Sequence, residues 1–464
     1  MQDPILPALP QEQIERNFAE IAPPMSAAEA LFEANRCLYC FDAPCAHACP
    51  THIDVPAFIK KIASGNLTGS ARAIFDANPI GATCARVCPV EVLCEGACVE
   101  KTLMQKPIEI GRLQRYATDY AMRAGRGLFA AGEPNGKSVG VVGSGPAGLS
   151  CATYLARLGY AVTIYDRREL PGGLDTYGMA EYKMRQGVSV EEARRVEQLG
   201  VRFRLGTEVG RDVTIDELER EHDAVFLAAG LGETNRLGVP GEDLAGVVDA
   251  LRFIERVKTR DWPSVGVGRV VAVVGAGNTA VDAATQARRL GAGRVFMVYR
   301  RTEREMPAYA YEYELAKRDA VEFLWQTAPV EILPDASGTG VGALRCVRTE
   351  LIEVGDTGRR EARAIAGTEF DLACDMVVKA TGQQKLRRFF ESIPGVECDT
   401  AGRVRVEPGT MRTGNPKFFA GGDCVNGGRE AVDAAQMGKH AAQGIHLSLT
   451  GERVAFAGSN GAAS

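Results

Sequence analysis

A glycine-rich motif that occurs twice places the strongest constraint on how this 464-residue chain can fold. In its first copy, residues 137–167, two apolar runs flank a Gly-x-Gly-x-x-Gly turn and an amphipathic helix pattern. Such a turn lets the backbone approach a pyrophosphate, which the N–H groups at the start of the helix can bind. An acidic residue about twenty positions further on can accept hydrogen bonds from ribose hydroxyls. We therefore predict a dinucleotide site formed by Gly143, Ser144, Gly145, Pro146, Ala147, Gly148 and Asp166.

The second copy, residues 268–305, has the same order of strand, turn, helix and strand, but a different end. Arginines replace the acidic residue after its second strand, and guanidinium groups bind a ribose 2′-phosphate that a carboxylate would repel. The alternative is that these arginines only form a solvated face. We predict an NADPH site, with NADH possible, formed by Gly275, Ala276, Gly277, Asn278, Thr279, Ala280, Arg300, Arg301 and Arg304.

The C-terminal part of the chain indicates which nucleotide each copy binds. An apolar run ends at Gly422 and Asp423, and a long helix is expected from about Arg429. In two-dinucleotide flavoproteins an Asp at this place faces the ribityl chain, and the dipole of the next helix stabilises the reduced flavin. We therefore predict an α/β fold with two Rossmann-like domains. The NAD(P)H-binding domain, residues 256–375, is inserted into a split FAD-binding domain, residues 131–255 and 376–464.

Eight of the thirteen cysteines lie between Cys37 and Cys98. Four of them fall in RCLYCFDAPCAHACP, residues 36–50, and closely spaced thiolates followed by Cys-Pro are typical of iron–sulfur ligation. Zinc is the alternative, because CxxC is a common zinc half-site and His47 and His52 lie nearby. The flanking segments show helical periodicity. We predict that residues 1–130 form an all-α iron–sulfur domain.

Composition excludes several classes of protein. A net charge of −5 gives no indication of a nucleic-acid partner. The N-terminus has no basic leader and the longest apolar runs are strand-sized, so neither a signal peptide nor a membrane span is expected. We predict a cytoplasmic protein whose thiols are reduced rather than paired as disulfides.

With these features the chain resembles a known family, the small subunits of glutamate synthase and the N-terminal part of dihydropyrimidine dehydrogenase. The resemblance runs from about Arg36 to the final helix and includes all cysteine blocks and both glycine loops. It also includes PGGL from Pro171, VVKATGQ from Val377 and FFAGGD from Phe418. It implies an NAD(P)H-dependent FAD and iron–sulfur oxidoreductase.

The same resemblance places Gly173 and Lys183 at the flavin, with two departures. Asp166 stands where the family more often has Glu, and Lys183 stands where it usually has Arg. Lysine keeps the positive charge but loses the bidentate geometry of a guanidinium group.

The resemblance also implies two [4Fe–4S] clusters. A plain count of eight cysteines would make Cys84 the eighth ligand, whereas the resemblance assigns that place to the oxygen of Gln114. The implied ligands of the first cluster are Cys37, Cys40, Cys45 and Cys98, and those of the second are Cys49, Cys88, Cys94 and Gln114.

Gln114 indicates a position within the family, because glutamate synthase small subunits tend to carry Glu there. Dihydropyrimidine dehydrogenases, including the flavoprotein subunit of the two-subunit bacterial form, carry Gln in a stretch like IGRLQRY. The resemblance then implies that hydride passes from NADPH to FAD, and single electrons pass through the clusters to an FMN-barrel partner that reduces uracil or thymine. The alternatives are a subunit of NADPH-dependent glutamate synthase and a related ferredoxin:NADP oxidoreductase. No acid–base or nucleophilic catalytic residue is predicted.

Two other readings of the sequence are less well supported. A disulfide reductase of the thioredoxin reductase kind needs a CxxC motif beside the flavin, yet beyond residue 98 no two cysteines lie within three residues. A non-catalytic nucleotide sensor with zinc in its N-terminal domain would lack both flavin and acid-labile sulfide.

Overall fold

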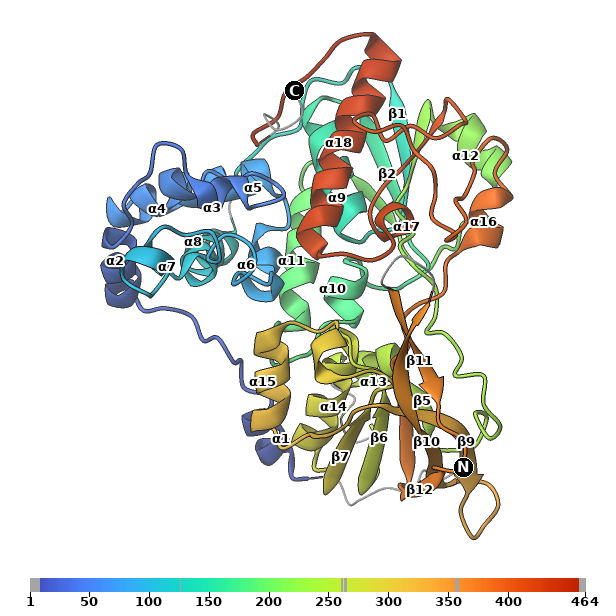
Figure 1. Cartoon of the computed structure of the whole chain (residues 1–464). Helices are drawn as coiled ribbons and strands as arrows, with labels where there is room; N and C mark the ends of the chain where they lie inside the picture. Colours follow the sequence, from blue (N-terminus) through green and yellow to red (C-terminus); the bar gives the residue numbers. More distant parts are fainter. Residues whose placement is uncertain (1–8, 126, 260–261, 263–264, 355–358, 459–464) are drawn as a thin grey trace. The chain divides into compact units, whose positions relative to one another are not determined.

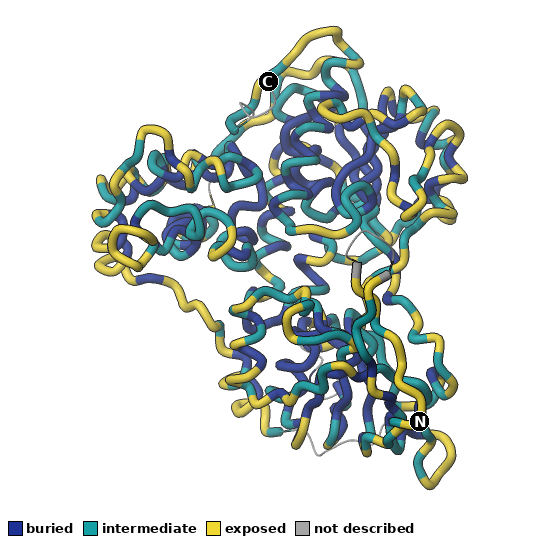
Figure 2. Tube along the Cα trace, in the orientation of Figure 1, coloured by how far each residue is buried: buried dark blue, intermediate teal, exposed yellow. Residues whose placement is uncertain are grey.

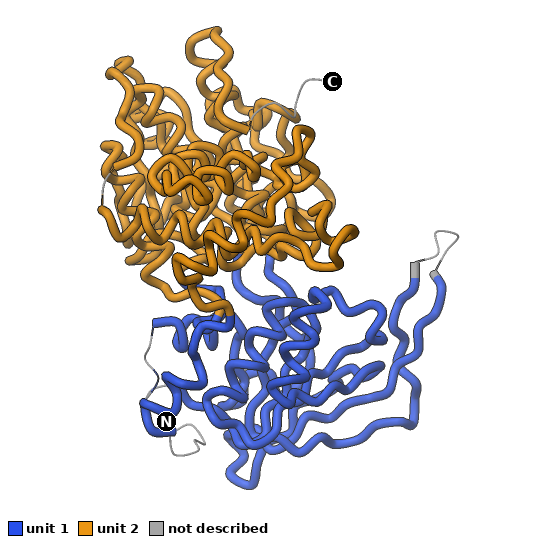
Figure 3. The backbone as a smooth tube through the Cα atoms, turned by 90° about the vertical axis from the view of Figure 1, so that its left-hand side faces the viewer, with its two compact units in different colours: residues 1–21, 177–182, 232–384 blue, residues 22–176, 183–231, 385–464 orange. Residues whose placement is uncertain are grey.

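The computed structural model describes residues 9–125, 127–259, 262, 265–354 and 359–458. The chain divides into two compact units, which Figure 3 shows in different colours. Unit 1 contains residues up to 21, 177–182 and 232–384, and unit 2 contains residues 22–176, 183–231 and those from 385 onward. One nucleotide-binding domain therefore interrupts the other in the sequence, as predicted.

Unit 2 is built around a parallel sheet of five strands in the order β14-β4-β1-β2-β3 (Figure 1). Parallel neighbours need crossover connections, and α9 supplies the one between β1 and β2. The strands are β1 (Ser138–Val142), β2 (Ala161–Tyr165), β3 (Arg202–Arg204), β4 (Ala224–Leu227) and β14 (Phe418–Ala420). The helices of this domain are α9 (Pro146–Arg157), α10 (Leu174–Tyr177), α11 (Gln186–Glu197), α12 (Ile215–Glu221), α16 (Arg387–Glu391), α17 (Asp423–Asn426) and α18 (Ala431–Thr450).

The N-terminal part of unit 2 is helical, and we call residues 22–125 the head. Its helices pack through apolar faces, which contain Phe58, Ile59 and Leu113. Two short helices meet at Gly65 and Asn66, and Asn66 caps the second of them. The helices are α2 (Ala27–Asn35), α3 (Pro44–His47), α4 (Val55–Ala63), α5 (Leu67–Ala77), α6 (Gly81–Val87), α7 (Glu100–Leu103) and α8 (Ile110–Ala124).

Unit 1 contains a second parallel sheet, in the order β5-β13-β6-β7-β8. Its strands are β5 (Val247–Asp249), β6 (Val270–Val274), β7 (Arg294–Val298), β8 (Glu322–Leu324) and β13 (Met376–Lys379). An antiparallel group adds β9 (Thr327–Pro334), β10 (Val341–Val354), β11 (Arg359–Ala364) and β12 (Phe370–Ala373). The helices are α1 (Gln11–Asn17), α13 (Ala250–Lys258), α14 (Asn278–Leu290) and α15 (Ala310–Arg318), with a 3₁₀ turn at Glu303–Glu305.

Each parallel sheet is buried, as expected for sheets covered by helices on both faces. Residues Val139–Val142 of β1 and Val271–Val274 of β6 are all buried, and Figure 2 shows this buried interior in both units. The two apolar runs of each glycine-rich motif therefore form central strands.

The boundaries of the units differ from the sequence-based division at four places, because residues up to 21, 177–182, 232–255 and 376–384 all lie in unit 1. Ile14 and Phe18, expected in the head, are buried in the core of unit 1, where Phe18 stacks on Trp262. Tyr182 also belongs to unit 1, and its hydroxyl donates to Asp282 in α14 at 3.2 Å. The first two differences arise from apolar or aromatic side chains whose partners are far away in the sequence, and the other two arise because β5 and β13 belong to the parallel sheet of unit 1. Among the described helices, none is long and apolar enough to cross a membrane.

Candidate functional site

The first glycine loop joins β1 to α9 and leaves an open space where a pyrophosphate can approach. Gly143 has a φ of 107°, and a Cβ there would lie 2.3 Å from the carbonyl oxygen of Ala228. A Cβ on Gly148 would lie 2.0 Å from the carbonyl oxygen of Gly143, which explains the tight contact between helix and strand. At Gly145, by contrast, the nearest atom to a Cβ would be 3.9 Å away. The empty side of Gly145, at the N-terminus of α9, fits the phosphates of FAD.

Asp166 follows β2 and faces this loop. Its Oδ2 accepts hydrogen bonds from the backbone N–H of Ser144 at 2.8 Å and from the Ser144 hydroxyl at 2.5 Å. Its Oδ1 accepts from the backbone N–H of Arg168. The carboxylate is therefore fixed beside the loop, where the sequence predicted a ribose-binding acid. The neighbouring Gly172 donates to the Ser144 carbonyl, so the PGGL stretch also packs on the loop.

The C-terminal segment, which contains Gly422 and α18, packs against the N-terminal part of α9. A Cβ on Gly422 would lie 3.1 Å from that of Ala147, and one on Gly438 would lie 2.2 Å from the Ala147 carbonyl oxygen. Small residues thus bring α18 close to α9. Burial raises the pKa of Asp423, which accepts a hydrogen bond from the backbone N–H of Arg429. Gly143, Asp166 and Asp423, which the sequence predicted as one FAD site, are therefore brought into one region of unit 2.

In unit 1 the second loop repeats this construction between β6 and α14. Gly275 has a φ of 137°, and a Cβ there would lie 2.3 Å from the Ala380 carbonyl oxygen. Gly277 begins α14 and is open on its free side, where the nearest atom to a Cβ is 4.0 Å away. Ala280, in place of a third glycine, is fully buried. The loop therefore leaves room for a second pyrophosphate.

The predicted phosphate-binding arginines follow β7 in a well-anchored loop. The carbonyl oxygens of Arg300 and Arg301 accept hydrogen bonds from Thr349 and Gln326. The next turn is capped by Thr302. The side chains of Arg300 and Arg304 are exposed, and Nε of Arg301 is buried without a hydrogen-bond partner in the described structure. This combination of a fixed backbone and available guanidinium groups fits an anion such as a 2′-phosphate.

Four cysteines of the head surround one hollow of about 360 Å³: Cys37, Cys40, Cys45 and Cys98. Apolar side chains, including Val55, Ile59 and Ile108, line the rest of it. Burial raises the pKa of the Cys45 thiol to about 12, so a metal must displace a proton there to bind the thiolate. No three His, Cys, Asp or Glu side chains of the described residues are arranged to hold a single metal ion. Thiols arranged around a hollow favour a cluster over zinc.

The other predicted cluster ligands lie where α6 and α8 meet. The pKa of Cys88 is raised, first by its hydrogen bond with Cys84 and then by burial, and the nearby Cys49 and Cys94 thiols add to this effect. Gln114 is buried in α8, and its Nε2 donates to the carbonyl oxygen of Gly81 at 2.7 Å. Within the described chain no hydrogen bond is found to its Oε1. The amide therefore has a fixed orientation and an oxygen that can serve as a ligand.

Cys84 occupies a different environment, since it is only 3% exposed and packs within the apolar core of the FAD-binding domain. Cys49 and Cys88 contact that same core, whereas Cys37, Cys45 and Cys98 pack only against the core of the head, which Cys49 and Cys94 also contact. The second group of ligands is thus the one nearer to the FAD-binding domain.

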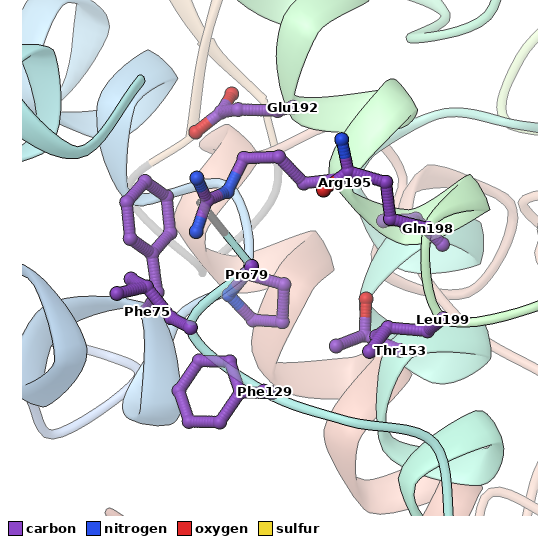
Figure 4. Close-up of a pocket in the computed structure, with 11 residues that line it drawn as sticks. Phe75, Pro79, Phe129, Thr153, Glu192, Arg195, Gln198 and Leu199 are labelled. Atoms are coloured by element: carbon purple, nitrogen blue, oxygen red, sulfur yellow. The ribbon is translucent and has the colours of Figure 1, made fainter. Parts of the chain in front are cut away.

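A second hollow of unit 2, of about 410 Å³, contains none of the predicted site residues. Figure 4 shows Glu192 and Arg195 of α11 beside Phe75 of the head, and the Arg195 guanidinium lies 4.5 Å from the Phe75 ring centroid. Glu192 accepts hydrogen bonds from the backbone N–H groups of Ala82 and Thr83 at the start of α6. This hollow therefore lies where the head packs on α11. No sequence signal pointed to Glu192, because its partners are over a hundred residues away.

Comparison with known proteins agrees with this arrangement. Residues 14–126 match the family of dihydropyrimidine dehydrogenase domain II with its 4Fe-4S cluster, and residues 137–438 match the pyridine nucleotide-disulphide oxidoreductases. The chain is 37% identical over 443 residues to the glutamate synthase [NADPH] small chain of Escherichia coli, covering 92% of this chain and 93% of that protein. It is 33% identical over 433 residues to the NAD-dependent dihydropyrimidine dehydrogenase subunit PreT of Escherichia coli, with coverage of 93% and 97%.

Solved structures show the same fold at lower identity. Mycobacterium tuberculosis FprA in complex with NADPH matches with a TM-score of 0.54 and 21% identity, over 70% of this chain and 87% of FprA. Lactococcus lactis thioredoxin reductase matches with a TM-score of 0.52 and 23% identity, over 68% of this chain and all of that one.

The fold and sites define an electron-transferring oxidoreductase with two dinucleotide-binding domains and an iron–sulfur head. More specifically, the chain belongs to the family of glutamate synthase small subunits and the N-terminal part of dihydropyrimidine dehydrogenase. The predicted family and fold class are confirmed, and the chain is an NAD(P)H-dependent FAD and iron–sulfur oxidoreductase. The individual ligand and nucleotide contacts stay predictions.

Proposed function

We propose that this chain is the NADPH-oxidising subunit of a two-subunit dihydropyrimidine dehydrogenase. The loop around Gly145 and Asp166 would hold an FAD that supplies hydride acceptance from NADPH, and the cysteines of the head with Gln114 would hold two [4Fe–4S] clusters that supply single-electron transfer to a partner subunit with an FMN barrel and further clusters. The observation that carries this choice is Gln114, whose amide orientation is fixed by Gly81 so that Oε1 can act as a cluster ligand. By the resemblance, dihydropyrimidine dehydrogenases carry Gln at this place, whereas glutamate synthase small subunits tend to carry Glu.

The residues of unit 2 support an order for the electron path. Cys49 and Cys88 contact the core of the FAD-binding domain, so the cluster that they would hold is the first acceptor after the flavin. The hollow lined by Cys37, Cys40 and Cys45 lies in the head, and the cluster that it would hold would receive the electrons second. The role of the chain would be to align the cofactors, and we assign no proton donor or nucleophile among the residues that the structure describes.

The surface around the hollow lined by Cys37, Cys40, Cys45 and Cys98 is suited to binding a partner protein. Leu38 lines the hollow and is 51% exposed, and Phe41, one residue after Cys40, is fully exposed. Phe32, Leu103 and Met104 of the head are also exposed large apolar residues. Exposed apolar residues gathered in one domain are typical of an interaction site. We therefore propose that the partner binds here, where electrons leave the chain.

Reconstitution tests the proposed function. The isolated chain should oxidise NADPH with artificial acceptors and should not reduce uracil. Together with an FMN-barrel partner it should reduce uracil to dihydrouracil at the expense of NADPH. Uracil reduction by the isolated chain contradicts the two-subunit assignment. Activity only with a glutamate synthase large subunit would instead establish the second candidate, which the 37% identity to the small chain of that enzyme supports.

The nucleotide preference has its own test. Replacing Arg300 and Arg301 with Ala should weaken NADPH binding by about 1.5–3 kcal/mol for each lost charge-assisted contact, with little effect on NADH. Arg294→Ala is a matched control, because Arg294 is at the opposite end of β7 and pairs with Glu322. Steady-state assays with an artificial acceptor measure both nucleotides, and equal losses for the two would refute a 2′-phosphate site.

A further inference from the structure

Lys439 is a lysine in the middle of α18 with no exposed surface. Its Nζ donates hydrogen bonds to the carbonyl oxygen of Thr51 at 3.1 Å and to that of Ala457 at 2.9 Å. It also lies 5.7 Å from the centroid of the Tyr154 ring, within the range of a cation–π interaction. One ammonium group thus joins the head, the FAD-binding domain and the C-terminal segment.

This buried ammonium has no carboxylate partner in the described part of the chain. Asp76, an acidic group that interacts with it at longer range, already pairs with Arg157 at 2.7 Å. Burial lowers the pKa of Lys439 to about 8, so the side chain is still mostly charged at neutral pH. A buried charge is costly unless an opposite charge is close. The buried ammonium group of Lys439 therefore needs a negatively charged group close to it.

The sulfur of Cys49 can provide that negative charge. A single residue, Thr51, links Lys439 to Cys49. The Thr51 carbonyl oxygen accepts a hydrogen bond from Lys439, and the Thr51 hydroxyl lies 3.4 Å from Cys49 Sγ. A cluster bound by thiolates adds one negative charge for each electron that it accepts. A fixed positive charge in a medium of low dielectric constant stabilises that extra charge.

We propose that Lys439 is a positioning residue that stabilises the reduced state of the cluster held by Cys49, and so favours electron transfer from the flavin. This inference rests on the proposed function, since it requires a cluster at Cys49. The side chain acts from the same helix whose N-terminus adjoins the predicted FAD site. α18 would then influence two of the redox centres predicted in unit 2, the flavin and the cluster at Cys49.

Two substitutions separate the charge of Lys439 from its hydrogen bonds. Lys439→Met removes both, whereas Lys439→Gln removes the charge and keeps an N–H donor for the carbonyl of Thr51. Redox titration followed by EPR should show one of the two cluster potentials shifted to more negative values in both variants, and the other unchanged. Lys317→Met is the control, since Lys317 is an exposed lysine of unit 1 that pairs with Glu314 and should shift neither potential.

Several results would overturn the proposal. If Lys439→Gln has the wild-type potentials while Lys439→Met does not, the role is hydrogen bonding and not charge. Unshifted potentials in both variants with full iron content also contradict it. If either variant loses iron, Lys439→Arg must restore both the iron and the potential, and its failure to do so refutes an electrostatic role. Wild-type protein without iron and acid-labile sulfide would instead refute the proposed function, before any variant is made.

Discussion

The glycines of the first loop have different physical tasks, although they share one motif. Gly148 permits close packing inside the protein, because a Cβ there would overlap the Gly143 carbonyl oxygen at 2.0 Å. Gly145 has a φ of −70° that any residue can adopt, and the protein leaves its Cβ position open. The open space at Gly145 is therefore available to a ligand, whereas the missing side chain of Gly148 allows the close packing of the fold.

This difference predicts opposite effects of two equal substitutions. Gly145→Ala should leave the melting temperature of flavin-free protein almost unchanged but reduce bound FAD, because the methyl group occupies the space for the pyrophosphate. Gly148→Ala should destabilise the flavin-free protein by about 1–3 kcal/mol through overpacking. Calorimetry and the flavin absorbance of purified protein measure both. A large loss of stability in Gly145→Ala would contradict the assignment.

Cys84 and Gln114 offer a similar contrast at the second cluster. Cys84→Ser should keep iron near eight atoms per chain, the content of two [4Fe–4S] clusters, because the resemblance gives this thiol no ligand role. Gln114→Ala should change the EPR spectrum or potential of one cluster only, since a hard oxygen ligand is lost. Iron and sulfide analysis with EPR of dithionite-reduced variants distinguishes them. Loss of a cluster in Cys84→Ser, with no change in Gln114→Ala, would make Cys84 the ligand.

At the scale of elements, α6 depends on side chains from two other helices. Glu192 of α11 binds the N–H groups of Ala82 and Thr83 and the Thr83 hydroxyl. Gln114 of α8 binds the Gly81 carbonyl oxygen. A helix of seven residues is too short to be stable by itself. The helix that carries Cys84 is therefore held by tertiary contacts.

The buried position of Glu192 predicts a pH dependence of stability. Burial raises its pKa from 4.5 to about 7, so the folded protein disfavours the charged carboxylate relative to the unfolded chain. The stability that Glu192 contributes is present in full below pH 4.5 and falls by about 3 kcal/mol as the pH rises through about 7. Glu192→Gln removes this titration.

The measurement compares melting temperatures of anaerobic holoprotein at pH 5.5 and pH 8. Wild type should lose stability relative to Glu192→Gln at the higher pH. Glu191→Gln, at a partly exposed acid of the same helix that pairs with Arg194, is the matched control. A wild-type curve that stays parallel to that of Glu192→Gln would show that burial does not shift this carboxyl group.

Sequence patterns predicted the elements better than the contacts between them. The strand, turn and helix around Gly143 follow from local chemistry, and the helical periodicity of the segments that flank the cysteines agrees with helices such as α8 at Ile110–Ala124. The attachment of Phe18 to unit 1, the cap formed by Glu192 and the burial of Lys439 could not be predicted, because each depends on partners far away in the sequence. The cysteine spacing indicated iron–sulfur chemistry, but only the fold shows which thiols line the same hollow.

At the scale of the whole molecule, the residues predicted to bind NADPH lie in unit 1 and the residues predicted to bind iron–sulfur clusters lie in unit 2. All of the predicted cluster ligands lie in unit 2, and Cys37, Cys45 and Cys49 pack against the core of the head. Removal of iron should therefore loosen the head, because metal binding and folding are coupled in small metal domains. Unit 1 has its own core and should keep its affinity for NADPH.

Anaerobic chelation followed by titration with NADPH tests this separation. Circular dichroism should show loss of helix, while nucleotide binding, followed by protein fluorescence, stays within about twofold of the untreated value, a change of about 0.4 kcal/mol. Arg301→Ala provides the control for specific binding. If binding of NADPH disappears together with the iron, the two units are not independent.

The interrupted order of the chain also has a consequence for its synthesis. Every segment of unit 1 has been synthesised once Gln384 is added, whereas the sheet of unit 2 still lacks β14, and α9 still lacks α18. Domains fold as their segments emerge during translation. We therefore expect the predicted NAD(P)H-binding unit to be complete before the predicted flavin site. A chain that stops before Phe418 should then bind a reduced nucleotide without a flavin that could pass its electrons to oxygen.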